Sequence, residues 1–491
     1  MSRLARTAWV SEALAIRLTS HRDQGLGQQL YVALRGWIES GELAAGEALP
    51  SSRQLARELS IARNTALSAL DRLAAEGFVV SRPGAGLFVA RLALAEAIHQ
   101  APIAPQKRQL SRRGDDLLAD CALSGGHHRA FAPGIPALDL FPREQWQRLL
   151  RRHQQRAPES WLAYQSGGGV KALKTALYDY LRLSRSVRCT PEQILITQGA
   201  QQGFELIARM LTDPGDGAWI EEPGYVGAQV ALKAAGLSLV PVPVDAEGID
   251  IERAPQGAPP KLIYVTPSHQ YPRGVTLSLS RRLALLETAR AQGSWIIEDD
   301  YDSEFRYSSP PLASLQGLMD QAPVIYVGTF SKVLYPGLRL GYLVLPEALV
   351  EPFQRANARI NREGQYAVQA ALAEFIEQGH FSRHVARMRR AYRSRQAALR
   401  RALAPAVDKG LTLSDGHAGM HLLAGLESVA CEQTLVAAGR AQGIQLSPLS
   451  RYFTGPPAQA GLVLGYAGSH EQDIARAGDW LARAWCKQRS S

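Results

Sequence analysis

The chain has 491 residues, about three times the usual length of one domain, so we expect more than one folding unit. Hydrophobic residues make up 46% of the chain and charged residues 20%, which is ordinary for a globular protein and excludes long disordered segments. The formal net charge of +10 is compatible with a polyanionic partner such as nucleic acid, but charge alone does not identify one.

Membrane, secretory and metal-binding signals are missing from the sequence. No apolar run approaches the roughly 20 residues of a transmembrane helix, and the N-terminal residues lack the apolar block of a secretory signal. The cysteines are too scattered for a zinc site or a disulfide framework; they are Cys121, Cys189, Cys431 and Cys486. We therefore expect a cytoplasmic protein with no membrane partner and no metal site.

The first ninety residues begin with two predicted helices. Apolar residues recur with the helical period over residues 26–38, and Gly41 follows where a C-terminal cap would lie. A second helix begins near Ser51, whose hydroxyl can cap its first turn, with Leu55 and Leu59 on the buried side. Two short helices in this order need a third partner to bury their apolar faces.

A third helix follows a short turn at residues 60–61. Its inward positions are small or apolar and comprise Ala66, Ala69, Leu70 and Leu73. Arg63, Asn64 and Thr65 lie outward at its N-terminus. This is the arrangement of a helix-turn-helix, in which the second helix of the pair presents its N-terminal side chains to the major groove of DNA.

Residues 76–89, EGFVVSRPGAGLFV, form two β-rich runs around a glycine turn, which predicts a hairpin wing. Together with LPSSRQLAREL at 49–59 and RNT at 63–65, this segment resembles the GntR-type winged helix. The resemblance implies contacts with a double-stranded DNA operator, through base edges and phosphates. The residues that it assigns to DNA are Arg53, Arg63, Asn64, Thr65, Arg82 and Gly84.

Two residues depart from the GntR pattern. Ala62 stands where the family often has a capping serine, which costs the third helix about 1 kcal/mol, and Leu87 replaces a common wing threonine. Both departures are expected to weaken DNA affinity. The alternative interpretation of the segment is a small helical subdomain without a DNA-binding role.

The chain divides into three predicted parts. A winged helix-turn-helix domain covers residues 24–91, and a larger domain covers residues 129–491. Residues 92–128 are Ala-rich at first and then Pro-rich and polar, with weak apolar periodicity, so we expect an exposed linker there.

The larger domain alternates short β-branched runs with helical stretches. The predicted strands are residues 194–197, 218–221, 262–266, 295–298 and 324–328. This alternation predicts an α/β fold with a mainly parallel sheet covered on both faces. Ligands of such sheets bind at the carboxyl ends of the strands, so the polar residues that follow each strand are the candidates for a site.

Four of these strand ends carry chemically useful groups. Gly199 and Ala200 open a helix, whose free amides can bind a phosphate. An aromatic ring, Tyr225, follows the second strand, an acidic run begins at Glu298, and Lys332 follows the last strand beside hydroxyl side chains. A lysine in this setting can form a Schiff base with an aldehyde while a nearby carboxylate keeps a pyridine nitrogen protonated.

Residues 131–491 resemble the fold-type I aminotransferases. The ordered segments EDDYDSEFR (298–306), GTFSK (328–332) and GLRLGY (337–342) are typical of the MocR (GabR-like) subfamily of GntR regulators. The resemblance implies pyridoxal 5'-phosphate as cofactor, Lys332 as the Schiff-base lysine, Asp299 beside the pyridine nitrogen and Tyr301 at the phenolic oxygen. It further implies Tyr225 stacked on the ring and a phosphate site made of Ala200, Gln201, Thr329, Ser331 and Arg339.

Two segments depart from the aminotransferase pattern. Tyr271 stands where aminotransferases usually carry an asparagine that bonds the cofactor oxygen, and His269 either assists in its place or faces solvent from a loop. Val463 stands where many aminotransferases place an arginine that binds the substrate carboxylate, although Arg451 is close in sequence. The resemblance therefore does not assign the substrates of amino-acid aminotransferases to this chain.

The leading functional hypothesis is a transcriptional regulator that senses an amine, an amino acid or pyridoxal phosphate itself through Lys332. Bound effector would bias the larger domain between conformations, and the linker would pass that bias to the DNA-binding head. The subfamily resemblance implies a head-to-tail homodimer. The alternative is a working aminotransferase with an accessory winged helix, because the same lysine and aspartate support amino-group transfer.

Overall fold

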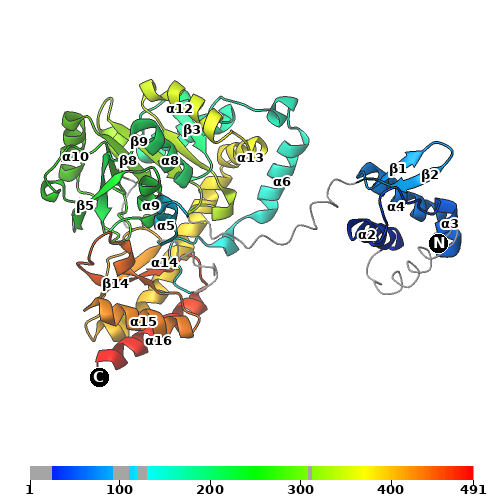
Figure 1. Cartoon of the computed structure of the whole chain (residues 1–491). Coiled ribbons are helices and arrows are strands. Elements are labelled where there is room, and N and C mark those ends of the chain that lie inside the picture. The colour runs from blue at the N-terminus through cyan, green and yellow to red at the C-terminus, as the bar shows by residue number, and fades with distance from the viewer. Residues whose placement is uncertain (1–24, 92–109, 120–129, 308–311, 490–491) are drawn as a thin grey trace. The chain divides into compact units, whose positions relative to one another are not determined.

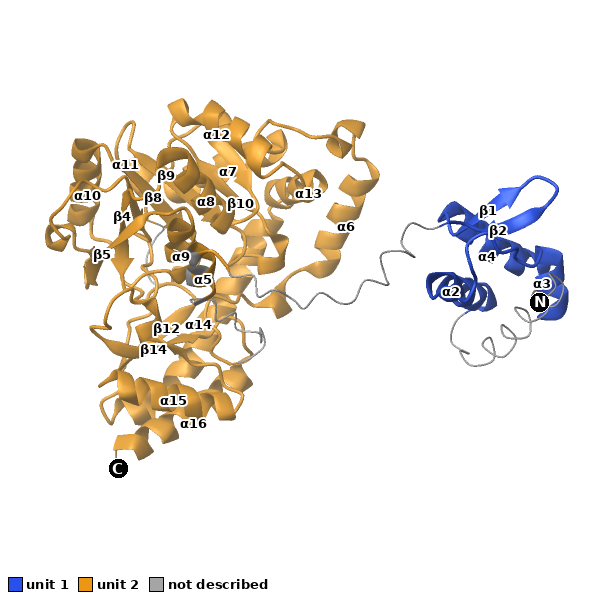
Figure 2. Ribbon diagram, in the orientation of Figure 1, with its two compact units in different colours: residues 1–109 blue, residues 110–491 orange. Residues whose placement is uncertain are grey.

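The computed structural model describes residues 25–91, 110–119, 130–307 and 312–489. The chain forms two compact units, Met1–Gln109 and Leu110–Ser491 (Figure 2). Most of the predicted linker 92–128 lies outside the described residues; within it the structure places one helix, α5 (Arg112–Ala119). Across the described ranges, no helix combines the length and apolar character needed to cross a membrane.

The first unit contains the three expected helices followed by a hairpin (Figure 1). The elements are α2 (Leu26–Glu39), α3 (Ser52–Glu58), α4 (Arg63–Ala75), β1 (Val79–Arg82) and β2 (Gly86–Val89). The two strands pair antiparallel, and the apolar side chains predicted to face inward are buried in one core. The predicted winged helix-turn-helix is therefore confirmed.

The second unit is built on an eight-stranded sheet with the order β3-β10-β9-β8-β7-β4-β5-β6. Its strands are β3 (Ile194–Thr197), β4 (Gly217–Glu222), β5 (Ser238–Asp245), β6 (Gly248–Ile249), β7 (Leu262–Val265), β8 (Trp295–Asp300), β9 (Val324–Thr329) and β10 (Gly341–Val344). The strands from β9 to β5 in this order are parallel, whereas β10 runs antiparallel to both of its neighbours and β6 is antiparallel to β5. The mainly parallel sheet is confirmed.

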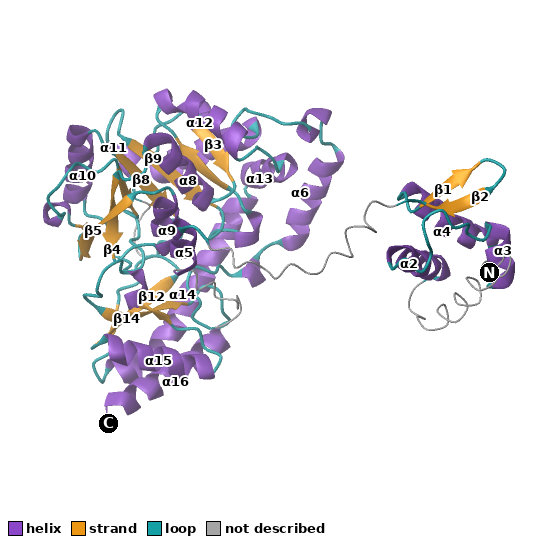
Figure 3. Ribbon diagram, viewed as in Figure 1, coloured by secondary structure: helices purple, strands orange, loops and turns teal. Residues whose placement is uncertain are grey.

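Helices cover both faces of this sheet (Figure 3). They are α6 (Arg143–Gln155), α7 (Lys171–Arg185), α8 (Ala200–Leu211), α9 (Val226–Ala234), α10 (Leu279–Gln292), α11 (Leu315–Leu318), α12 (Glu347–Ile360) and α13 (Tyr366–Glu377). Because side chains alternate along a strand, Ile196 packs into the core of one face and its neighbour Leu195 into the core of the other. Both residues are almost fully buried, as expected for a sheet covered on two sides.

A smaller antiparallel sheet completes the second unit, with the order β11-β12-β14-β13. Its strands are β11 (Thr412–Leu413), β12 (His421–Leu426), β13 (Ser447–Pro448) and β14 (Ala460–Gly465), and its helices are α14 (His380–Val407), α15 (Val429–Ala441) and α16 (Glu471–Arg489). Helices α14 and α16 approach closely at Gly478, where a Cβ would lie 2.6 Å from the Cβ of Ala402. The sheet β11-β12-β14-β13 is called the four-stranded sheet.

The start of α4 generates a stability prediction. Ser51 caps α3 by accepting a hydrogen bond from the backbone N–H of Gln54, whereas Ala62, in a similarly extended backbone conformation, makes no side-chain cap for α4. The substitution Ala62→Ser should therefore stabilise α4 by about 1 kcal/mol, and Ser51→Ala should destabilise α3 by a similar amount. Hydrogen exchange of the α3 and α4 amides in the full chain measures both effects. Unchanged exchange in α4 of the Ala62→Ser variant would contradict the prediction.

Candidate functional site

The central pair of the site is Lys332 and Asp299, at the carboxyl ends of the adjacent parallel strands β9 and β8. The Lys332 Nζ donates a hydrogen bond to the Gly134 carbonyl oxygen at 3.0 Å. Asp299 is buried, and its Oδ2 accepts a hydrogen bond from the Tyr264 hydroxyl at 2.6 Å. The other oxygen, Oδ1, is buried and has no hydrogen-bond partner among the residues that the structure describes. An acceptor left unpaired in the interior is costly unless a ligand or water completes it.

Burial shapes the acidity of both groups. Burial raises the pKa of the Asp299 carboxyl to about 7, although the hydrogen bond from Tyr264 opposes that shift. Burial also lowers the pKa of the Lys332 amine, and the carboxylates of Asp302 and Asp299 oppose this second shift. A lysine with a lowered pKa has more of the neutral amine that attacks carbonyl carbons.

The residues predicted to bind phosphate converge at the start of α8. Gly199 precedes the helix with a positive φ of 94° and provides no side-chain cap. The Arg339 guanidinium lies 3.6 Å from the position that a Cβ on Gly199 would occupy. A side chain at Gly199 would therefore press on this arginine beside the first amides of α8, those of Ala200 and Gln201.

Strand register brings Thr197 and Thr329 to the same edge of the sheet, one on each side of Gly341. Gly341 of β10 pairs with Thr329 on one side and with Thr197 on the other. The Thr329 hydroxyl lies 3.1 Å from that of Ser331 and also accepts a hydrogen bond from the Ser331 backbone N–H. Hydroxyls, a guanidinium and a helix N-terminus at one edge form a suitable site for a phosphate group.

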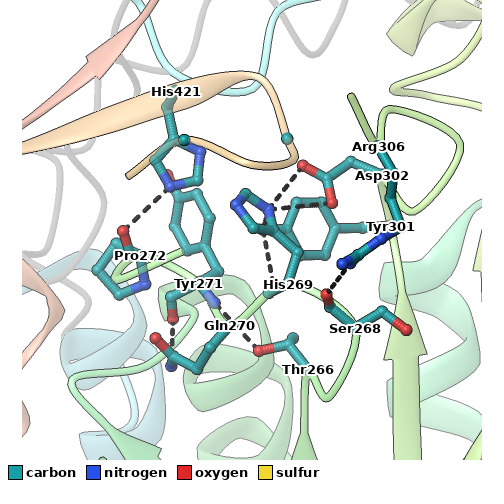
Figure 4. A network of polar contacts seen from close by, with 12 residues as sticks. Thr266, Ser268, His269, Gln270, Tyr271, Pro272, Tyr301, Asp302, Arg306 and His421 are labelled. Atoms are coloured by element: carbon teal, nitrogen blue, oxygen red, sulfur yellow. Dashed lines mark hydrogen bonds and ion pairs between the residues drawn. The ribbon is translucent and has the colours of Figure 1, made fainter. Parts of the chain in front are cut away.

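Tyrosine rings form another part of the site. Tyr225 lies at the start of α9, and its ring is perpendicular to that of Tyr271 at a centroid distance of 5.8 Å. The Tyr271 ring also lies 5.8 Å from that of Tyr301. The Tyr301 hydroxyl donates to the His269 carbonyl oxygen at 2.9 Å (Figure 4). The predicted residues Tyr225 and Tyr301 are thus linked through Tyr271, the residue that stands in place of the usual asparagine.

His269 is not a solvent-facing loop residue, so that alternative is wrong. Its side chain is 3% exposed, and Nδ1 lies 3.0 Å from Oδ2 of the buried Asp302. The sequence pattern did not single out Asp302, Tyr264 or Gly134. Asp302 lies inside the acidic run at 298–306 and Tyr264 within a predicted strand, whereas Gly134 is far away in sequence and carried no signal.

The position expected to bind a substrate carboxylate is apolar. Val463 in β14 is fully buried and packs with Leu449 and Tyr452. Arg451, the cation close in sequence, is exposed on a short 3-10 helix at Leu449–Tyr452. The strand therefore offers no cation at this position.

Most residues predicted to contact DNA lie on the surface of the first unit. Arg53, Arg63 and Asn64 are exposed, and Thr65 is half-buried because its methyl group packs against Gly27 of α2. On the hairpin, the guanidinium of Arg82 lies over the Phe88 ring at 4.4 Å, and Gly84 has a φ of +70°. Glycine suits this turn because side chains rarely adopt a positive φ. The first turn of α4 and the hairpin tip are thus open to a partner.

Comparison with known proteins covers both units. Residues 26–89 match the family of bacterial regulatory proteins described as gntR, and residues 138–462 match aminotransferase class I and II. The chain is 40% identical to the probable rhizopine catabolism regulatory protein MocR of Rhizobium meliloti, over 96% of this chain and 95% of that protein. It is 30% identical to the pyridoxine biosynthesis transcriptional regulator PdxR of Corynebacterium glutamicum, over 94% and 97% of the two chains.

A solved structure agrees with these sequence matches. The α-aminoadipate aminotransferase LysN of Thermus thermophilus superposes with a TM-score of 0.67 and 28% identity, over 81% of this chain and all of that one. The similarity to regulators extends through the winged helix and the aminotransferase-like unit together. The chain accordingly belongs to the MocR subfamily of GntR transcriptional regulators, which join a helix-turn-helix head to an aminotransferase-like domain.

Proposed function

We propose that this regulator binds pyridoxal 5'-phosphate at Lys332 and senses an amine, an amino acid or the cofactor itself, and that this binding changes its affinity for a DNA operator. The observation that carries the proposal is the buried Oδ1 of Asp299, which has no partner in the described part of the chain and lies on the strand next to the one that leads to Lys332. A protonated ring nitrogen is the kind of donor that would complete this carboxylate.

The remaining residues fit the other parts of the cofactor. Arg339, Thr329, Ser331 and the first amides of α8, at Ala200 and Gln201, would hold the phosphate. Tyr225 would cover the ring, and Tyr301 would approach its phenolic oxygen. When bound, the cofactor supplies an aldehyde that condenses with amines. The LysN structure contains N-(5'-phosphopyridoxyl)-L-leucine, which supports the fit because that protein shares the fold.

The protein's own groups prepare the site for this role. Lys332 is held by Gly134 and has a lowered pKa, so its amine takes up an aldehyde readily. The pKa of Asp299 is raised because burial makes its charged form unfavourable, and a cation beside the carboxylate would offset this desolvation penalty. Val463 gives an amino-acid carboxylate no cation to bind, so the site lacks at this position the contact that many amino-acid aminotransferases use to hold their substrates.

The head would read DNA through the start of α4 and the wing. Arg63, Asn64 and Thr65 would reach base edges and phosphates in the major groove, Arg53 would contact the backbone, and Arg82 with Gly84 would add wing contacts. A head-to-tail homodimer would present two heads to paired half-sites. An effector can alter DNA affinity only if it binds two conformations of the protein unequally.

Reduction with borohydride tests the cofactor site. We expect borohydride treatment of the protein loaded with pyridoxal phosphate to fix one cofactor on the peptide that contains Lys332, as measured by mass spectrometry. Lys332→Ala should lose both the label and the visible absorption. Lys174→Ala is the matched control, since Lys174 is also buried and also donates to a glycine carbonyl. A label that is absent from Lys332 in the wild type would refute the proposal.

The DNA-binding role is tested by Arg63→Ala. This change should weaken binding to the duplex upstream of the protein's own coding sequence by about 1–3 kcal/mol, roughly fivefold to 150-fold in Kd. Cofactor labelling should be unchanged. Arg355→Ala, which removes an exposed arginine of α12, is the control and should bind DNA as the wild type does. Absence of sequence-specific binding together with rapid multiple turnover of amines would instead identify a working aminotransferase.

A further inference from the structure

The loop that follows β7, residues 266–274, is held rigidly against the eight-stranded sheet. The Thr266 hydroxyl donates to Glu221 at 2.6 Å and accepts from the Tyr271 backbone N–H at 3.1 Å. The Gln270 side-chain amide donates to the Pro223 carbonyl oxygen at 2.9 Å. Side chains on this loop therefore have fixed positions, including His269 at its centre.

His269 and Asp302 form an almost completely buried pair. The Nδ1 atom of His269 lies 3.0 and 3.2 Å from the two carboxylate oxygens of Asp302, whose side chain is 1% exposed. A carboxylate at this depth is costly unless a donor compensates it, so the imidazole and the carboxylate fix each other. Asp302 is also the carboxylate with the largest charge effect on Lys332, ahead of Asp299.

The same histidine holds Tyr301. The tyrosine hydroxyl lies 2.9 Å from the carbonyl oxygen of His269 and 2.9 Å from its Nδ1 (Figure 4). His421 of β12 lies beside the ring at a centroid distance of 5.2 Å, and Tyr271 of the same loop as His269 packs against His421. Arg306 donates to the neighbouring carbonyl of Ser268 at 3.1 Å. Both of these contacts of the Tyr301 hydroxyl come from one residue, His269, while the Tyr271 ring packs against the Tyr301 ring.

The four-stranded sheet closes over the His269 ring through a glycine. A Cβ on Gly419, two residues before β12, would lie 1.9 Å from Cε1 of His269, so the ring lies directly against the glycine backbone. Gly419 is itself fixed, since its N–H donates to the Phe305 carbonyl and its carbonyl accepts from the Tyr466 hydroxyl at 2.7 Å. Any shift of the four-stranded sheet at this point must move the ring or leave a gap beside it.

We infer that His269 is a positioning residue of the cofactor pocket. Asp302 fixes its ring, and the ring together with the backbone carbonyl of His269 orients Tyr301. Contact of the ring with Gly419 makes the pocket responsive to the position of the four-stranded sheet. This inference rests on the proposed binding of pyridoxal phosphate. It gives the regulator a physical link between the pocket and the four-stranded sheet. The link runs from Tyr301 through His269 to Gly419, and each of these residues contacts the next.

The test uses the visible absorption of the full chain loaded with pyridoxal phosphate, titrated with pH. His269→Ala should shift the midpoint of the absorption change by at least about 0.5 pH unit. Asp302→Asn should lower the midpoint, because it removes a carboxylate that favours a positive charge at Lys332. His269→Asn, which keeps a donor near the place of Nδ1, should restore most of the wild-type behaviour.

A double-variant cycle tests whether His269 acts through Tyr301. In the Tyr301→Phe background, His269→Ala should shift the midpoint clearly less than it does in the wild type, because the hydroxyl beside Nδ1 is gone and only the effect through Asp302 is left. Additive shifts would overturn the inference. Gly419→Ala should reproduce the shift of His269→Ala, because the new Cβ displaces the ring.

Matched controls separate positioning from general destabilisation. His153→Ala removes a histidine of α6 that also pairs with a carboxylate, that of Glu374 in α13. Gly443→Ala introduces a side chain at a positive φ of 71° with open space around it. Both should keep the wild-type midpoint. If borohydride labels the wild type at Lys332 but the midpoints of His269→Ala and Gly419→Ala are unshifted, this inference alone is overturned. If the wild type is not labelled at Lys332, the proposed function is refuted as well.

Discussion

The functional half of the molecule is organised around a carboxylate buried with only one of its oxygens satisfied. Tyr264 binds Oδ2 of Asp299 and leaves Oδ1 without a protein donor. The apolar packing of the sheet that surrounds the aspartate offsets the cost of this burial, and the cost is visible in the raised pKa of the group. In the proposed site, a ligand that brings a hydrogen-bond donor to that oxygen relieves the penalty, whereas a ligand without a donor there does not.

Much of this arrangement is predictable from the sequence, because strand ends and sequence motifs are local properties. Helix periodicity located α2, α3 and α4, and β-branched runs located the strands that carry Asp299 and lead to Lys332. The antiparallel β10 was not predicted as a strand, since its direction depends on pairing with two neighbours distant in sequence. Gly134 was missed for the same reason: its contact with Lys332 spans about two hundred residues and leaves no trace in either segment.

Buried polar pairs are a second limit of sequence-based prediction. A histidine in a loop is equally compatible with solvent and with a buried partner, and only the fold decides between them. His269 is buried because Asp302 meets it on one side and two glycines, Gly274 and Gly419, leave room for its ring. These glycines lie in two different loops, one after β7 and one before β12, so no local pattern could have revealed the space that they leave for the ring.

The short connection between β9 and β10 limits the distance between two of the proposed cofactor-binding residues. Lys332 and Arg339 lie on this single connection, which turns through a short 3-10 helix at Pro336–Leu338 and a left-handed residue at Arg339 before it re-enters the sheet. The spacing between amine and guanidinium is therefore set by one covalent segment anchored at both ends by strands. In the proposed site, a small molecule must present its carbonyl group and its anionic group at this separation to reach both residues.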